Sequence, residues 1–344
     1  MILSRRQFLK KVSKTGLAVS GYLTFGKTLT GCSSISSNLI LSEKSPVIYP
    51  PLPGRKVQPP ENGCYIGFEG GTIDIYKKEL GVVPKIVMPG NFIMDIRRTF
   101  LKEQVEEISS HGAIPLIWRE FNFEIAYYGF NNIVGQPEVT KELTTYARAI
   151  VDFGKPLFIS SMREMNGDWY VWGQNPNAFK KVWKYMWQIF EDQGANEFAT
   201  WFWEPYAPYV REAQFDDPER YYPGDQYVDY TGFSAYARTR FPRTDRSFRE
   251  LVEPTYISMR RNHPNKPVMT AEFGKTNDRY QAAWLKDAFK TIRSWPGMKA
   301  AIFFNSSNPF YSTNPSHWDD HTLSADSMKM YKTILQDPYF IVVK

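Results

Sequence analysis

Short apolar runs alternate with longer amphipathic segments along most of the chain, beginning near residue 61. Eight of these runs have the length and composition of buried strands. They are Cys64–Phe68, Lys85–Met88, Ala113–Trp118, Leu157–Ser161, Phe198–Trp203, Tyr227–Phe233, Val268–Ala271 and Lys299–Phe304. Strands that alternate with helices predict a parallel sheet. Eight such units predict that residues 61–344 form one α/β domain, a (β/α)8 TIM barrel.

The clearest helix signal follows Asn175 and Pro176, because Asn is a favoured N-cap and Pro fits the first turn of a helix. Large apolar residues then recur at helical spacing and predict one buried face, and Gly194 predicts its end. The residues of this face are Phe179, Val182, Trp183, Met186 and Phe190.

The N-terminal 31 residues have the pattern of a targeting segment. Ser4-Arg-Arg-Gln-Phe-Leu-Lys10 resembles a twin-arginine export signal, and the apolar stretch after it is too short and too polar to be a stable membrane span. Leu29-Thr-Gly-Cys32 resembles a lipoprotein box, in which Cys32 would be lipidated and become the mature N-terminus. We therefore expect an exported protein of the cell envelope that is lipid-anchored to a membrane.

Residues 32–60 are rich in Ser and Pro and offer few apolar side chains. Repeated prolines exclude a helix, so we expect an extended tether between the lipid anchor and the domain.

The net charge of +6 does not indicate a nucleic-acid partner. Residues 1–31 hold six Lys and Arg and no acidic residue, so the remainder of the chain is formally neutral. Without a basic surface, binding to nucleic acid is not expected.

Cysteine and histidine usage predicts neither a disulfide within the chain nor a metal site. If Cys32 is lipidated, Cys64 has no partner, and its apolar surroundings predict a buried free thiol. The four histidines lack the spacing of metal ligands, and we interpret them as surface or loop residues. They are His111, His263, His317 and His321. No cofactor is expected, because the chain has no phosphate-binding glycine loop.

Two glutamates follow predicted strands four and seven. Glu164 lies in Arg163-Glu-Met-Asn-Gly-Asp-Trp169, and Glu272 lies in Ala271-Glu-Phe-Gly274. A barrel brings its strand ends together at one rim, so these carboxyls are expected to face each other. Such a pair, ~5 Å apart, cleaves glycosidic bonds with retention of configuration, one carboxyl acting as nucleophile and the other as acid and then base. Burial beside Trp169 and the charge of Glu272 would raise the pKa of the acid, Glu164.

Arg163 leaves one point of this interpretation open. A guanidinium beside Glu164 would favour the ionised carboxylate and oppose an acid role. Neighbouring residues of a strand point in opposite directions, so Arg163 faces either the barrel interior or the adjacent strand. Each glutamate taken singly could equally form a structural ion pair, and only their joint placement favours catalysis.

These motifs resemble those of glycoside hydrolase family 26. Arg163–Gly173 is similar to its acid/base motif, Ala271–Gly274 to its nucleophile motif and Tyr221–Tyr236 to its sixth-strand signature. The resemblance implies that Glu164 is the acid/base, that Glu272 is the nucleophile contacted by Tyr236, and that Trp169 helps to bind sugar. It further implies substrate contacts from residues near the strand ends, namely Arg163, Trp172, Trp203, Phe304 and Asn305.

Three positions depart from the pattern of the mannanases in that family. Arg163 stands in place of His, Ser234 in place of Asp, and Phe304, before Asn305, in place of Trp. All three lie where the sugar beside the cleaved bond is bound, so the two-glutamate machinery is intact while the mannan preference is in doubt.

The favoured interpretation is a retaining endo-β-glycanase, with β-1,4-mannan as the leading substrate and a monomeric state. The alternatives within the family are hydrolysis of mixed-linkage β-glucan or of β-1,3-xylan. From other classes, the alternatives are a non-catalytic polysaccharide-binding lipoprotein and a partner in exopolysaccharide assembly.

Overall fold

The computed structural model describes residues 47–89, 99–207, 215–238, 246–306 and 320–343. All of them belong to one compact unit, residues 39–344. The predicted targeting segment 1–31 and the predicted lipidation site Cys32 lie outside the described residues. No helix in these ranges has the length and apolarity needed to cross a bilayer.

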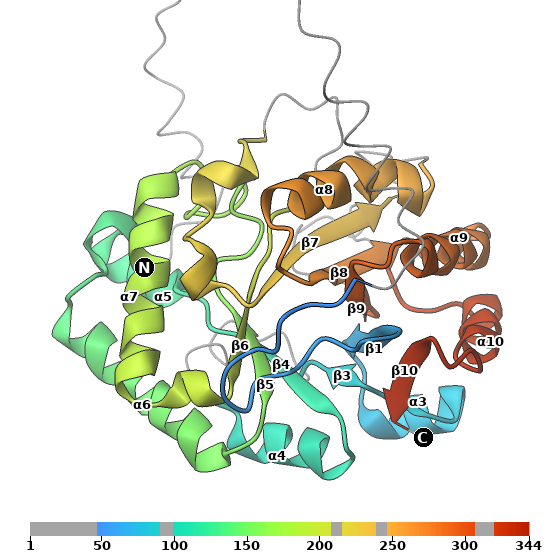
Figure 1. Cartoon of the computed structure of the whole chain (residues 1–344), viewed down its shortest axis with the longest axis horizontal. Helices are drawn as coiled ribbons and strands as arrows, with labels where there is room; N and C mark the ends of the chain where they lie inside the picture. The colour runs from blue at the N-terminus through green and yellow to red at the C-terminus, as the bar shows by residue number, and fades with distance from the viewer. Residues whose placement is uncertain (1–46, 90–98, 208–214, 239–245, 307–319, 344) are drawn as a thin grey trace, which may run out of the picture. The chain divides into compact units, whose positions relative to one another are not determined.

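In the described part of the chain, eight parallel strands form a closed barrel (Figure 1). The strands follow each other in chain order, and pairing of the first with the last closes the circle. They are β1 (Cys64–Glu69), β3 (Ile86–Val87), β4 (Ile114–Trp118), β5 (Leu157–Ser160), β6 (Ala199–Trp203), β7 (Tyr230–Ala237), β8 (Val268–Lys275) and β9 (Met298–Phe304). Each of them overlaps a predicted strand, so the predicted (β/α)8 barrel is confirmed.

Two further strands were not predicted. β10 (Phe340–Val343) pairs in parallel with the start of β1 and antiparallel with β2 (Val83–Pro84). β2 is two residues long, which is too short to give a periodic pattern. This pairing attaches the C-terminal segment to the first strand of the barrel.

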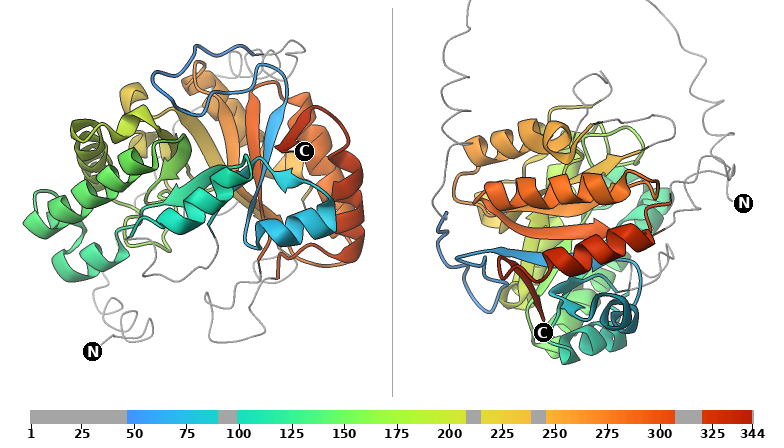
Figure 2. Two further views of the ribbon diagram at one scale, coloured as in Figure 1. Left: turned by 90° about the horizontal axis from the view of Figure 1, so that it is seen from below. Right: turned by 90° about the vertical axis from the view of Figure 1, so that its right-hand side faces the viewer.

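Helices surround the strands, as the two views of Figure 2 show together with Figure 1. The α-helices described are α3 (Ile73–Leu80), α4 (Lys102–Ser110), α5 (Asn122–Tyr128), α6 (Pro137–Phe153), α7 (Pro176–Asp192), α8 (Phe248–Asn262), α9 (Gln281–Ser294) and α10 (Ala325–Ile334). The helix predicted after Asn175 is confirmed as α7, since the Asn175 side chain accepts a hydrogen bond from the Ala178 amide and the predicted apolar face is buried.

Alternating side chains separate an inner core from an outer one. On β6, Phe202 belongs to a cluster inside the barrel, while Trp201 and Trp203 pack in the layer between strands and helices. Cys64 faces this outer layer, is fully buried and has a free thiol, as predicted. Burial raises the pKa of that thiol, which makes it a poor nucleophile.

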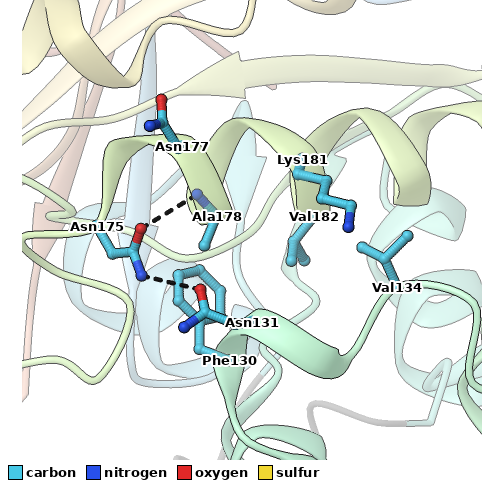
Figure 3. A pocket seen from close by; sticks show the side chains of 8 residues that line it. All are labelled: Phe130, Asn131, Val134, Asn175, Asn177, Ala178, Lys181 and Val182. Carbon is cyan, nitrogen blue, oxygen red and sulfur yellow. Dashed lines mark hydrogen bonds between the residues drawn. The ribbon is translucent and has the colours of Figure 1, made fainter.

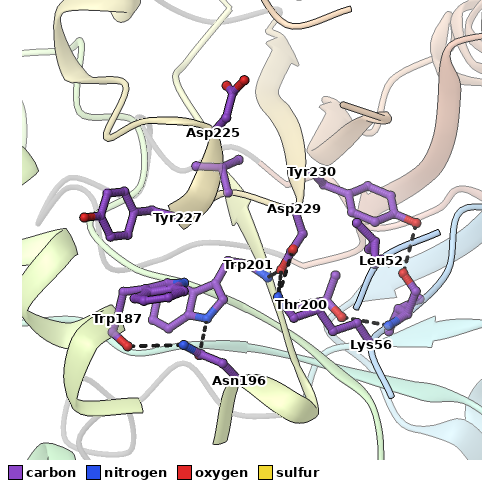
Figure 4. Close-up of polar contacts among 12 residues, drawn as sticks. Leu52, Lys56, Trp187, Asn196, Thr200, Trp201, Asp225, Tyr227, Asp229 and Tyr230 are labelled. Atoms are coloured by element: carbon purple, nitrogen blue, oxygen red, sulfur yellow. Dashed lines mark hydrogen bonds and ion pairs between the residues drawn. The ribbon is translucent and has the colours of Figure 1, made fainter. Parts of the chain in front are cut away.

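Residues 47–60 close the N-terminal mouth of the barrel, which corrects the prediction of a tether with little to bury. Val57 lies in the inner cluster, and its amide donates a hydrogen bond to Thr200 Oγ1 at 2.8 Å. Lys56 Nζ contacts both carboxylate oxygens of Asp229 at 2.9 Å, and Asp229 also accepts the amide of Trp201 (Figure 4). The prolines do exclude a helix, but the extended chain supplies backbone groups and two side chains to the barrel floor.

Candidate active site

The chain turns sharply where it leaves β5, and this turn places Glu164. Both Met162 and Glu164 have a φ of 53°, a conformation that is uncommon for residues other than glycine. Two hydrogen bonds fix the turn: the Glu164 amide donates to the carbonyl of Glu204 at 2.8 Å, and Trp172 Nε1 donates to the carbonyl of Arg163 at 2.8 Å. A strained backbone held by its neighbours is typical of functional sites.

Both carboxylate oxygens of Glu164 accept a hydrogen bond. Ser234 Oγ donates to Oε1 at 2.7 Å, and Trp169 Nε1 donates to Oε2 at 2.7 Å. Burial, followed by the charge of Glu272, raises the pKa of Glu164, while Arg163 and the two donors act in the opposite direction. We expected Trp169 to raise this pKa by burial, but its indole N–H donates to the carboxylate and so favours the ionised form.

A β-bulge directs Glu272 into the barrel. Phe233 pairs with Thr270, but Ser234 pairs with Glu272, so Ala271 is the extra residue. Strict alternation from Met269, which faces inward, would place Glu272 outside and Phe273 inside. Instead, Phe273 packs in the outer core. The bulge changes the alternation at this point and re-aims the carboxylate, a recognised use of bulges beside active sites.

Glu272 is buried, with an exposed fraction of 3%, and receives two hydrogen bonds. Arg163 Nη1 donates to Oε1 at 2.5 Å, and the Tyr236 hydroxyl donates to Oε2. The pKa of Tyr236 is raised well above its usual range by burial and then by the charge of Glu272, so the phenol remains a donor. The predicted contact between Tyr236 and Glu272 is therefore present, and two donors stabilise negative charge on Glu272.

Trp169 is the predicted sugar-binding aromatic that remains accessible, with an exposed fraction of 37%. Its edge packs against the stacked rings of Tyr206 and Phe215, at centroid distances of 5.2 and 5.5 Å. Gly167 lies directly beneath the indole, since a Cβ there would fall 2.3 Å from ring atoms. Trp169 is thus held in place beside Glu164 with part of its surface free for a ligand.

Two other predicted contact residues do not reach the site. Trp203 is fully buried on the outer face of β6, where it packs against Tyr222 and His263. Trp172 is fully buried and stacks on Tyr170 at 4.5 Å. Both side chains are fully buried among other rings, so Trp203 supports the core and Trp172 supports the turn at Glu164.

Phe304 is the last residue of β9 and Asn305 follows it, at the same end of the barrel as the glutamates. Phe304 packs edge-on against Tyr236 at 5.6 Å. Asn305 connects neighbouring segments of the chain. Its side-chain Oδ1 accepts a hydrogen bond from the backbone amide of Leu323 at 2.9 Å, and its backbone N–H donates to the carbonyl of Glu69. Phe304 therefore supports Tyr236, and Asn305 acts through the backbone around it.

The sequence interpretation missed several polar residues at this end of the barrel. Buried carboxyls follow β4 and β6 at Glu120 and Glu204, and Glu69 ends β1. His321, which we interpreted as a surface or loop residue, lies outside the helices and strands but is buried beside Tyr236 and Phe304, at ring distances of 5.2 and 5.7 Å. The carboxyls carried a readable signal, since each stands just after the end of a strand predicted from the sequence, as Glu164 and Glu272 do.

The other two histidines in the described ranges, His263 and His111, each contact a side chain nearby. His263 follows the last residue of α8, is buried against Tyr222, and contacts Glu219 through its Nε2. His111 contacts Lys77 at the surface. His317 lies outside the described residues. Within the ranges that the structure describes, no group of three or more His, Cys, Asp or Glu side chains is arranged to hold a metal ion.

A separate hollow lies between the first turns of α7 and the turn at Phe130 (Figure 3). Two of its asparagines are engaged in local structure, because Asn175 caps α7 and donates to Asn131 Oδ1 at 3.1 Å. None of the glutamates at the barrel rim lines it, so it is distinct from the candidate active site.

The family model described as glycosyl hydrolase family 26 matches residues 107–284, which is more than half of the 344 residues. The chain belongs to glycosyl hydrolase family 26. The matched range contains Glu164, Glu204 and Glu272, and so includes the carboxyls around which the site is built.

Curated relatives match parts of the chain. Endoglucanase H of Acetivibrio thermocellus is 27% identical over 175 residues, covering 47% of this chain and 19% of the relative. Mannan endo-1,4-beta-mannosidase A and B of Caldalkalibacillus mannanilyticus is 25% identical over 203 residues, covering 50% and 37%. The chain thus spans well under half the length of these relatives.

Among solved structures, a family 26 β-mannanase from Bacteroides ovatus is similar, with a TM-score of 0.60 and 14% identity. The match covers 82% of this chain and 91% of that chain. At this identity the similarity supports the barrel fold alone.

Proposed function

We propose that the chain is a retaining endo-β-glycanase in which Glu164 is the acid/base and Glu272 the nucleophile. The observation that carries this proposal is the contrast between two neighbouring carboxyls. Burial and the charge of Glu272 raise the pKa of Glu164, whereas Glu272 is held by Arg163 and Tyr236 as donors. Two carboxyls in opposed environments are suited to hold a proton and a negative charge respectively.

In the first step, a Glu272 oxygen attacks the anomeric carbon while Glu164 gives its proton to the glycosidic oxygen, so the leaving sugar departs as an alcohol. This forms a covalent glycosyl-enzyme. In the second step, Glu164, now ionised, takes a proton from water as the water oxygen displaces Glu272. Ser234 and Trp169 stabilise the ionised Glu164 that exists between the two steps.

We propose β-1,4-mannan as the substrate, because relatives named as mannan endo-1,4-β-mannosidases match the chain. The relative named endoglucanase H favours a β-glucan as the closest rival. The test is a panel of mannan, mixed-linkage β-glucan and β-1,3-xylan incubated with the full chain, measured by the release of reducing ends. Fastest release from β-glucan would change the substrate and keep the mechanism.

The two roles are tested separately by alanine substitution. Glu272→Ala should abolish turnover, whereas Glu164→Ala should spare the first step on aryl glycosides with good leaving groups, which need no acid. Azide should then rescue Glu164→Ala by attacking the glycosyl-enzyme. Glu107→Ala, which changes an exposed carboxylate on α4, is the matched control. Initial products of inverted configuration in NMR would contradict the retaining mechanism. Full activity in both active-site variants would overturn the roles of the two glutamates, and no hydrolysis by the wild-type chain would favour a binding protein.

We also propose export and a lipid anchor, on the basis of Arg5, Arg6 and the Leu29–Cys32 box. Changing both arginines to lysine should block export. Changing Cys32 to Ala should release the protein from membranes, and unchanged membrane association would contradict the anchor.

A further inference from the structure

Glu204 is a third carboxyl that faces the candidate active site. It follows β6 and has an exposed fraction of 0%. On this strand Phe202 lies in the inner core and Trp203 in the outer core. Because strand side chains alternate, Glu204 points into the barrel, at the end where Glu164 and Glu272 lie.

The surroundings of Glu204 agree with this direction. Burial raises its pKa, and the next largest causes are the charges of Glu272 and then of Glu164. Its carboxyl therefore lies close enough to the two glutamates of the proposed mechanism for their charges to act on it. Its backbone contributes as well, since its carbonyl accepts the Glu164 amide at 2.8 Å.

No hydrogen-bond partner is found for either carboxylate oxygen of Glu204 in the described part of the chain. Arg163, whose charge favours ionised Glu204, donates instead to Glu272 and to the hydroxyl of Tyr170. A buried carboxyl without a partner is unfavourable for the folded protein, and such groups call for an explanation in function. A ligand that brings hydrogen-bond donors would remove this cost.

We propose that Glu204 is a substrate-binding residue that accepts hydrogen bonds from hydroxyl groups of the sugar attacked by Glu272. The inference rests on the proposed glycanase function. Neighbouring hydroxyls of a pyranose can donate to both oxygens of one carboxylate, which would make Glu204 a determinant of sugar specificity. A site built to bind a hydroxyl rejects analogues that lack it, because its polar group is then left unpaired.

The kinetic test uses 4-nitrophenyl β-mannobioside and analogues that lack one hydroxyl in the sugar next to the nitrophenyl group. For wild-type protein, removing the hydroxyl that Glu204 binds should lower kcat/KM at least about tenfold. In Glu204→Ala the same removal should have an effect below about twofold, because the partner is already gone. Equal sensitivity of wild type and variant to every removal would overturn the proposal.

A binding test separates this proposal from the proposed hydrolysis. Manno-oligosaccharides and β-gluco-oligosaccharides should raise the Tm of wild-type protein more than that of Glu204→Gln, with Glu107→Gln behaving as wild type. Equal shifts, or no shift in wild type, would overturn the role of Glu204. A shift specific to wild type without any hydrolysis would leave this role standing and remove the glycanase function instead. Without ligand, Glu204→Gln should be at least as stable as wild type, so misfolding cannot mimic the result.

Discussion

The guanidinium of Arg163 donates a hydrogen bond to the carboxylate of Glu272, 109 residues further along the chain. The guanidinium lies over the ring of Trp118 at 5.3 Å, and its Nε donates to the hydroxyl of Tyr170. The sequence left open whether Arg163 would oppose an acid role for its neighbour Glu164. Because its guanidinium is directed at the proposed nucleophile, burial and the charge of Glu272 outweigh it, and the pKa of Glu164 is raised.

Replacing Arg163 tests two effects of its guanidinium, the hydrogen bond to Glu272 and the electrostatic effect on the pKa of Glu164. Arg163→Met removes a donor from Glu272, so kcat/KM should fall by about 100-fold or more. The charge of Arg163 also lowers the pKa of Glu164. Its loss should keep Glu164 protonated to higher pH, and the alkaline limb of the kcat/KM profile should move upward. Arg163→Lys, which keeps the charge, is the control, and an alkaline limb that moves equally in both variants would contradict the electrostatic explanation.

Ser234 should affect the alkaline limb of the kcat/KM profile through its hydrogen bond to Glu164. Its hydroxyl donates to Glu164 Oε1 and lowers the pKa of Glu164. In Ser234→Ala the ionised acid loses a donor, so the alkaline limb should again move to higher pH. Ser234→Cys keeps only a weak donor and should fall between wild type and Ala. A downward movement in the pH profile of Ser234→Ala would show that the bond stabilises the protonated form.

Gly167 should be intolerant of a methyl group. An alanine Cβ would overlap the Trp169 ring at 2.3 Å, and the indole would have to move away from Glu164. Gly167→Ala should raise KM and cost about 1–3 kcal/mol of stability through overpacking. In the double variant with Trp169→Ala the stability cost should largely disappear, since the clash is gone. Additive losses in stability, measured by denaturant unfolding, would place the strain elsewhere.

The ion pair at the barrel floor should matter for stability and not for chemistry. Lys56 and Asp229 have side-chain exposures of 7% and 11%. Asp229→Ala leaves Lys56 without its partner and should cost about 3–5 kcal/mol. Asp229→Asn keeps an oxygen for the Trp201 amide and should cost less. For folded protein, kcat should be unchanged in both variants. A change in kcat would show that the Lys56–Asp229 pair influences the candidate active site.

Glu204 should make stability depend on pH in a defined direction. Its pKa in the folded protein is raised above its ordinary value of 4.5 by burial and by Glu272 and Glu164. The folded state therefore holds this proton more tightly than the unfolded chain. The contribution of Glu204 is fully present below about pH 4.5 and is lost as pH rises through the folded pKa. The stability of Glu204→Gln relative to wild type should thus increase from pH 4 towards pH 8. A constant difference would mean that Glu204 does not titrate with folding.

The barrel could be predicted from the sequence because it is built from repeated strand–helix units, and each unit has its own local sequence pattern. Each apolar run marks a strand, and the Asn175–Pro176 start marks α7. The same signals could not assign faces near the strand ends, so Trp203 was expected in the site although it packs outside. Proline-rich composition indicated an extended chain at 47–60 but could not reveal that Val57 enters the core, because the surface it buries against comes from distant strands.

The β-bulge at Ala271 sets the direction in which the Glu272 side chain points. If β8 kept all its residues but lost the bulge, strict alternation from Met269 would turn Glu272 towards the helices and Phe273 towards the barrel interior. Such a chain would still contain both glutamates and the surrounding motif letters. Among distant relatives, therefore, the motif letters alone do not show that the second glutamate faces the sugar, because the register of this one strand decides its direction.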